Sequence, residues 1–284
     1  MTRLGVALIA VVVNGLLFVS PAQAEAPEWR SYPLGQRLTV GVAGFRPNID
    51  TKISTTGPGN AIQGNIDFER DLGLEDSKTT TIGALRWRIS KRNQLRFDYF
   101  NLDRSSQSSS EVSITIQPDS GPPVTFPVDT QLQSALDIEA YNLSYAFSIL
   151  FDEKKDWSIG LGLSWQDIAA SVTNPLDVTE FADIDVGAPL PTLNTTFSYA
   201  FSDKWLLDLG LGWLDVEFDL KDDGRFEGRI ISLNADLRWQ TWDHLGFVLG
   251  YRSFDVDVEA EDSDFNGDLE YDYRGPFLGV SAYF

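Results

Sequence analysis

The stretch WSIGLGLSW, residues 157–165, decides the fold of this chain. Its large residues Trp157, Ile159, Leu161, Leu163 and Trp165 occupy every second position, and Ser or Gly fills the positions between them. The stretch WLLDLGLGW, residues 205–213, repeats the pattern, with Leu206 as the one exception. Alternation with period two indicates a β-strand that has one apolar face. A membrane-spanning strand needs about 9–11 residues and carries aromatic residues at both interfaces, which is how the tryptophans bracket each stretch.

The same alternation recurs in the segments 85–89, 95–99, 141–149, 231–239 and 245–251. Opposite the apolar face, these segments carry Arg86, Arg88, Asp98, Asp236 and Arg238. Such a face is too polar for the core of a soluble protein, whereas it suits the interior of a barrel that has lipid outside. The sequence therefore predicts an all-β fold, a transmembrane antiparallel up-and-down β-barrel.

The strand count is expected to be ten to twelve, with both termini on one side because the number is even. A first hairpin, residues 37–53 and 62–71 around TGPGN, favours twelve strands, and twelve is the preferred number. Ten would result if 94–117 were a single strand and 62–71 part of a loop, which the short turn at KRN favours. Short polar turns at 90–94, 151–156, 202–204 and 241–244 alternate with longer links, as in outer-membrane barrels whose long loops lie outside the cell.

The N-terminal residues have the features of a secretory signal peptide. Arg3 precedes an apolar run, and Ala22-Gln23-Ala24 forms a small-residue cleavage site. A membrane-anchoring helix is the alternative, but Pro21 and the short apolar core argue against it. The expected organisation is a signal peptide at 1–24, a periplasmic segment at 25–36 and the barrel domain at 37–284.

Composition restricts the function classes further. The formal charge of −20 disfavours binding to nucleic acid, since phosphates would be repelled. The chain has no cysteine and therefore no disulfide. Aromatic residues make up 12% of an acidic chain, a composition unusual for a soluble enzyme.

The chain ends with FLGVSAYF, residues 277–284, which alternates to its last residue and predicts a strand that closes the barrel against the first one. With these patterns, the sequence resembles the single-chain β-barrel proteins of the Gram-negative outer membrane. FERDLGL (68–74) and the following LRWRISKRNQLRFDYFNLDR resemble small uncharacterised porin-like members. The resemblance implies contact with outer-membrane lipid and lipopolysaccharide, whereas an oligomer does not follow from it. It also implies that the barrel-assembly machinery reads Leu278, Val280, Ala282 and Phe284.

An enzymatic function is not expected, and no catalytic residue is assigned. Outer-membrane hydrolases generally use a histidine as base, because its pKa lies near neutrality. The only histidine, His244, lies in the short turn TWDH, which the layout places on the periplasmic side.

One acidic segment resembles a cation-binding loop. Residues Asp262, Asp264, Asn266, Asp268 and Glu270 fit the start of a calcium loop with Gly267 at its turn, although Tyr273 occupies the position of the usual final Glu. The alternative is a hairpin tip, because Asn-Gly favours a two-residue turn. No other cofactor is expected.

A second set of charged residues is expected inside the barrel: Arg86, Arg88, Arg96, Asp98, Asp208, Asp236, Arg238 and Arg252. These residues either form a salt-bridge network that stiffens the wall, or a constriction that selects solutes by charge. Gly160, Gly162, Gly210 and Gly212 would leave room for a pore. The sequence thus favours a narrow channel for small solutes. The alternative is a non-conducting structural or surface-interaction barrel whose acidic outer loops bind cations.

Overall fold

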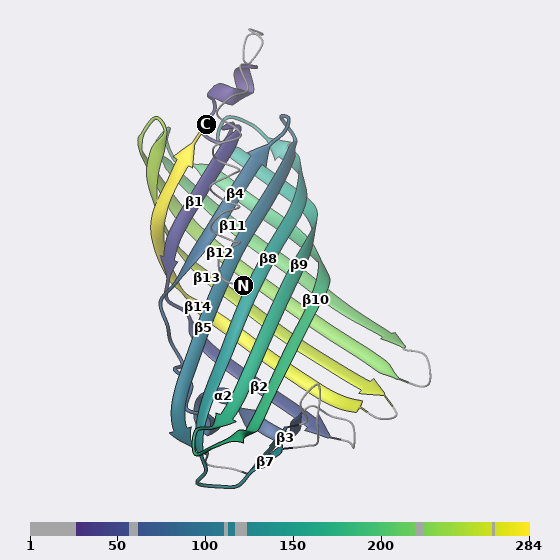
Figure 1. Cartoon of the computed structure of the whole chain (residues 1–284). Coiled ribbons are helices and arrows are strands. Elements are labelled where there is room, and N and C mark those ends of the chain that lie inside the picture. Colours follow the sequence, from purple (N-terminus) through teal and green to yellow (C-terminus); the bar gives the residue numbers. More distant parts are fainter. Residues whose placement is uncertain (1–26, 57–61, 111–112, 117–123, 220–223, 263–264) are drawn as a thin grey trace.

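The computed structural model describes residues 27–56, 62–110, 113–116, 124–219, 224–262 and 265–284. The expected signal peptide lies outside these residues. The chain forms one closed antiparallel barrel of ten strands (Figure 1). In order around the barrel these are β1 (Leu38–Phe45), β4 (Thr80–Arg88), β5 (Asn93–Ser109), β8 (Gln131–Phe151), β9 (Lys155–Asn174), β10 (Asp177–Ala200), β11 (Trp205–Asp219), β12 (Arg225–Trp242), β13 (Leu245–Asp262) and β14 (Phe265–Tyr283). No helix in the described residues is long and apolar enough to cross a membrane.

The final strand closes the barrel, as the alternation in FLGVSAYF predicts. β14 pairs with β1 from Phe277↔Phe45 to Tyr283↔Thr39, and the backbones of Leu38 and Phe284 exchange two further hydrogen bonds. The predicted short turns after β4, β8, β10 and β12 lie at this same end, which we call the turn end. The link between β9 and β10, expected to be long, is a two-residue turn at the other end, because residues 177–188 continue β10. The opposite end is called the loop end.

The strand number lies within the predicted range, at ten, so the preference for twelve is wrong. β5 runs unbroken to Ser109, and the expected strand 62–71 is a short strand, β3 (Ile62–Asp67), followed by one helical turn, α2 (Phe68–Asp71). The Asp67 carboxylate accepts a hydrogen bond from the Arg70 backbone and caps this turn. β2 (Asn48–Thr56) continues β1 along β14, and β3 adds to it with the short strands β6 (Ile114–Ile116) and β7 (Val124–Phe126).

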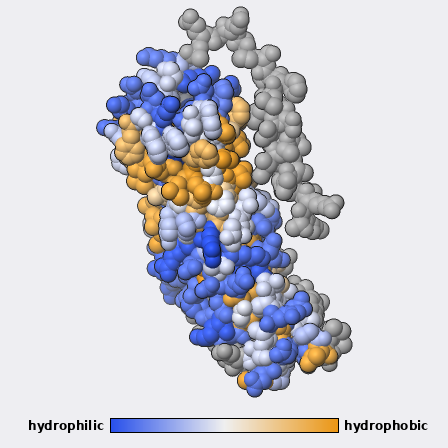
Figure 2. Space-filling view, turned by 90° about the vertical axis from the view of Figure 1, so that its left-hand side faces the viewer, coloured by the Kyte–Doolittle hydropathy of each residue, from blue (hydrophilic) through white to orange (hydrophobic). Residues whose placement is uncertain are grey.

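Exposed apolar side chains of β1, β4 and β8 to β14 form a belt on the outside of the barrel near the turn end. On the face in Figure 2, hydrophilic surface lies above and below this belt. Leu161, Leu249 and Leu278 point outward there and are more than half exposed. Trp205 and Trp239 stack at one edge of the belt with ring centroids 5.6 Å apart, and Tyr141 pairs in register with Trp165 at the other edge. These features match a lipid-facing surface with two aromatic girdles.

The strands continue well beyond the belt. β8, β9 and β10 contain 21, 20 and 24 residues, about twice the length needed to cross a bilayer. At the second girdle the apolar side of each strand changes. In β8, Leu143 faces outward, whereas Leu136 and Ile138 face inward and are buried. The part of the barrel toward the loop end therefore has a polar outside and an apolar inside, like a soluble β-protein.

The wall is not continuous at every height. β10 and β11 pair only from Leu193↔Trp213 to Ala200↔Leu206, and beyond Trp213 they diverge (Figure 1). Pro189 and Pro191 give the physical reason. β10 keeps an unbroken ladder with β9 through both prolines, so the missing N–H groups lie on the edge facing β11.

Between β2 and β5 the segment that follows β3 fills the gap. Arg104 of β5 pairs with Glu69 and donates to Thr51 Oγ1 at 2.8 Å, and Ser108 donates to the Leu72 carbonyl at 2.8 Å. The side chain of Arg104 is buried, so these contacts fix the segment against the wall.

Candidate functional site

The lumen, toward which the predicted charges point, consists of three layers. Ion pairs and the N-terminal segment close the turn end, a polar cavity lies in the middle, and an apolar cluster fills the loop end. All eight predicted lumen charges lie on the inner face of the barrel, and the three layers determine what they can do.

The turn-end layer is built around Arg88 of β4. Its guanidinium pairs with the carboxylate of Asp156 and donates to the Lys91 carbonyl at 3.0 Å, and both paired side chains are almost fully buried. Gln94 donates to Asp156 Oδ2 at 2.9 Å and to Ser148 Oγ at 3.0 Å. Arg88, Gln94, Ser148 and Asp156 are all buried, so their side chains pack tightly against the inner wall formed by β4, β5, β8 and β9.

The expected periplasmic segment adds a second seal at this end. After the 3₁₀ turn η1 (Glu28–Ser31), Leu34 is fully buried against Leu206 and Ala200. The Tyr32 ring stacks on Phe151 with centroids 6.1 Å apart. The segment therefore packs on inner residues of β10 and β11 at the mouth of the barrel.

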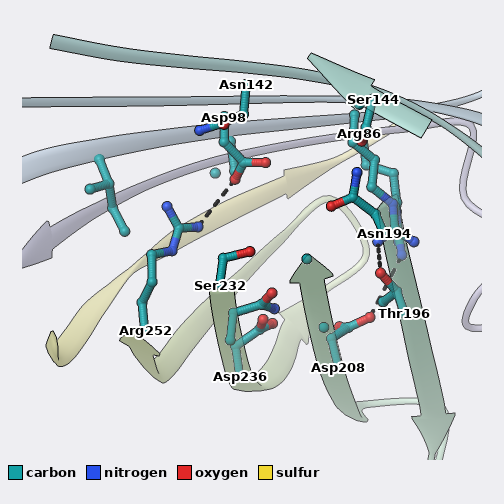
Figure 3. A pocket seen from close by; sticks show the side chains of 18 of the residues that line it. Arg86, Asp98, Asn142, Ser144, Asn194, Thr196, Asp208, Ser232, Asp236 and Arg252 are labelled. Carbon is teal, nitrogen blue, oxygen red and sulfur yellow. Dashed lines mark hydrogen bonds and ion pairs between the residues drawn. The ribbon is translucent and has the colours of Figure 1, made fainter. Parts of the chain in front are cut away.

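The middle layer is a cavity of about 270 Å³, which we call the lumen chamber. Figure 3 shows its charged and amide side chains projecting from several strands toward one another. Arg252 donates to Asp98 at 3.1 Å from the far side of the lumen. Asp208 pairs with Arg238, accepts from Ser198, and lies 3.9 Å from Arg86 Nη1. Asp236 lies 3.6 Å from Arg238 Nε.

The sequence led us to expect free space beside the lumen glycines, but Gly210 and Gly212 lie against neighbouring side chains. A Cβ at Gly210 would meet the amide of Asn234, and one at Gly212 would meet Ser232 and Asn194. The space beside these two glycines is occupied by neighbouring polar side chains, which line the chamber.

The loop-end layer is an apolar cluster that the sequence reading missed. Phe45, Phe100, Phe254 and Tyr273 contribute rings from different strands, and Phe100 stacks on Tyr273 with centroids 4.8 Å apart. The signal for this layer was present in the sequence, because the alternation of β8 and β13 changes side at Tyr141 and Tyr251.

The remaining predicted sites lie elsewhere. His244 Nδ1 is 3.0 Å from the Tyr283 carbonyl and its ring stacks on Phe284, so it contacts the last strand at the turn end. Of the calcium-loop residues, Asp264 and the side chains of Asp262 and Asn266 lie outside the described residues. Among the side chains that are described, no group of three or more metal-ligating residues is arranged to hold an ion. The expected assembly residues Leu278, Val280 and Phe284 are exposed on the outer face, and their recognition remains a prediction.

Comparison with known proteins gives the fold. No protein-family model matches the chain, and no curated protein sequence is significantly similar to it. Among solved structures, the outer membrane protease OmpT from Escherichia coli matches 87% of this chain and 97% of its own, with a TM-score of 0.53 and 11% identity. The chain has the fold of a Gram-negative outer-membrane β-barrel protein.

Two further barrels align over most of their length with lower scores. The outer membrane protein OprG from Pseudomonas aeruginosa has a TM-score of 0.34 at 11% identity, covering 88% of this chain and 97% of its own. The translocator domain of NalP from Neisseria meningitidis has a TM-score of 0.37 at 9% identity, covering 98% and 94%. At these identities the likeness concerns the fold and carries no activity to this chain.

Proposed function

We propose that the protein is an integral outer-membrane barrel with a closed lumen, which presents a projecting acidic surface rather than a permanently open channel. The observation that carries this proposal is the filled lumen. Buried ion pairs and Leu34 close the turn end, and an aromatic cluster closes the loop end. Ten-stranded barrels lie between side-chain-filled eight-stranded barrels and open sixteen-stranded porins, and here side chains pack at both ends and leave the lumen chamber between them.

The projection beyond the belt supports a role at the cell surface. Its interior is apolar, and its outer wall carries rows of acids that face one another across strands. One row runs through Asp255, Asp272 and Asp50 on three neighbouring strands. With the loop end outside the cell, this wall favours contact with cations or with a basic partner.

Planar-bilayer recording of the purified full chain tests the proposal. We expect no steps of current at moderate voltage, because neither end of the lumen offers a water-filled path. Stepwise conductance from the unmodified chain would overturn the closed-lumen assignment.

A narrow channel is the second candidate. It is favoured because the turn-end mouth is sealed partly by the segment 27–36, which lies outside the barrel wall and can move without breaking strand pairing. Deleting 27–36 should then produce current that the full chain lacks. A deletion variant that folds and remains silent would rule out gating by this segment.

A further inference from the structure

Two arginines face each other in the wall of the lumen chamber. Arg86 of β4 and Arg96 of β5 are direct cross-strand partners in the antiparallel register, and both line the chamber. Like charges directly opposite one another destabilise a strand pair. In an interior with little water, each charge also needs a compensating partner. Arg86 and Arg96 therefore require negative charge close by.

The carboxylates of the chamber supply little of the negative charge that Arg86 and Arg96 require. Four arginines line the chamber, namely Arg86, Arg96, Arg238 and Arg252, against three aspartates, Asp98, Asp208 and Asp236. Arg252 forms an ion pair with Asp98, and Arg238 forms one with Asp208. The contact between Arg86 and a carboxylate is longer, with 3.9 Å between Arg86 Nη1 and Asp208 Oδ1.

Arg96 has no carboxylate partner among the described residues. Its guanidinium donates to the hydroxyl of Thr196, to Gln94 Oε1 at 3.3 Å and to Ser158 Oγ at 3.4 Å, and all three acceptors are neutral. The Nε atoms of Arg86 and Arg96 are buried and have no hydrogen-bond partner in the described structure. A guanidinium offers five donors in a planar fork that fits carboxylates and phosphates, so these two retain donors for an anion.

The rest of the chamber wall suits the uncharged part of a small solute. Asn142, Asn194 and Asn234 offer amide donors and acceptors, and Ser144 and Ser232 offer hydroxyls. Figure 3 shows Asn194 beside Arg86 and Asn142 near Asp98. A protein cavity of about 150 Å³ holds a molecule as large as benzene, so the cavity of about 270 Å³ accepts a small ligand.

We propose that the lumen chamber binds a small oxyanion, an organic carboxylate or a phosphate, between the guanidinium groups of Arg86 and Arg96. The inference rests on the closed lumen of the proposed function, because water screens the interaction between an anion and the two arginines less inside a closed lumen than on the outer wall. The inference adds the chemical class of ligand that the chamber binds, which the proposed function does not specify.

Arg96→Gln is the decisive variant, because it removes one guanidinium without leaving a buried carboxylate unpaired. The parent and the variant are refolded into detergent with sodium acetate, sodium phosphate or sodium chloride at equal ionic strength, and the unfolding temperature is followed by tryptophan fluorescence. Acetate and phosphate distinguish a carboxylate from a phosphate ligand. We expect the parent to be stabilised by at least one of them over chloride, and Arg96→Gln to weaken that binding by about tenfold or more.

The matched control is Arg229→Gln, which removes an exposed guanidinium on the outer wall and should leave the anion response unchanged. A second readout is stability in chloride alone. The Arg96→Gln variant should be no less stable than the parent there, since it relieves repulsion between like charges. Equal responses of the parent to all three salts, or a variant that is destabilised in chloride and responds like the parent, would overturn the site.

This outcome is separable from that of the proposed function. A protein that conducts and still shows the Arg96-dependent anion response would disprove the closed lumen and keep the anion site. A silent barrel without the response would keep the closed lumen and disprove the site.

Discussion

The buried pair at the turn end gives the sharpest energetic prediction. Replacing Arg88 with Gln removes the ion pair to Asp156, one donor to the Lys91 carbonyl, and a guanidinium whose Cζ lies 4.4 Å from the centre of the Phe151 ring. The exposed fraction of the side chain is 0% for Arg88 and 1% for Asp156. In the variant the carboxylate stays buried, and Gln94 remains as its donor.

Breaking a buried pair by removing one partner costs about 3–5 kcal/mol, because the other charge loses its compensation. Since Gln94 still donates to Asp156, we expect Arg88→Gln to lower the free energy of unfolding by about 3 kcal/mol, the lower end of that range. Arg88→Gln/Asp156→Asn should recover a good part of the loss, as two amides can hydrogen-bond without a net charge. Urea unfolding in liposomes, followed by tryptophan fluorescence, measures both variants against the parent.

The outer-wall pair between Arg229 and Asp257 is the control. It has the same chemistry at 3.0 Å, but its side chains are 53% and 42% exposed. Arg229→Gln should cost no more than about 1 kcal/mol, because solvent screens an exposed pair. If Arg88→Gln costs as little as Arg229→Gln, the turn end is hydrated and the argument for a sealed lumen fails.

Three further changes test other parts of the structure. Leu209→Arg on the belt should lower the free energy of unfolding by about 2–4 kcal/mol in the same assay. Leu176→Arg, in the turn at the loop end, should leave it almost unchanged, and equal losses would contradict the position of the belt. Burial and the neighbouring acid Asp50 raise the pKa of Asp272, so this carboxyl contributes stability at low pH that is lost as pH rises above about 4. The melting temperature of Asp272→Asn relative to the parent should therefore rise between about pH 4 and pH 7; a difference that does not change with pH would refute this. Deleting Phe284 should lower the yield of heat-modifiable barrel in the outer membrane, and a wild-type yield would remove its assigned role in assembly.

The alternation within single strands was enough to predict the barrel. In β9 and β11 each apolar stripe is bracketed by tryptophans at the spacing of a bilayer, and the closing role of β14 follows from the alternation of its last eight residues. These features are local, because each strand must present apolar residues to lipid and polar residues to the lumen, whatever the sequences of the other strands.

Contacts between distant segments could not be predicted in this way. Leu34 lies in a segment without periodicity, and its burial depends on Leu206, far away in the sequence. Arg104 is part of the serine-rich end of β5, and its role follows from Glu69 reaching across the gap between β2 and β5. Asp156, in a short turn that reads as solvated, is buried because Arg88 and Gln94 both point toward it.

The count of strands was misjudged for a related reason. Both alternatives treated residues 62–71 as either wall or loop, whereas in the structure Ile62–Asp67 pairs with β2 outside the ten-stranded wall and the helical turn after it packs inward. Phe68 and Leu72 are almost fully buried in the apolar cluster, which is possible only because β4 begins at Thr80 and leaves the wall open above it. A hairpin and a packed loop segment carry the same local sequence signals, so the tertiary neighbours decide between them.

The change of apolar side along the strands explains why the sequence predicted the polar layer of the lumen and missed the apolar cluster at the loop end. In the belt the outer face must be apolar because it contacts lipid, so polar residues are left for the lumen. Beyond the second girdle the outer face contacts water, and the apolar residues move to the inside, as Val256 of β13 and Leu214 of β11 do. The change needs no β-bulge. Successive residues point to opposite faces, so the apolar residues only have to move from the odd to the even positions of the strand, or the reverse. The turn-end half of a strand is thus apolar outside and polar inside, and its loop-end half is polar outside and apolar inside. The polar chamber lies in the half that lipid surrounds.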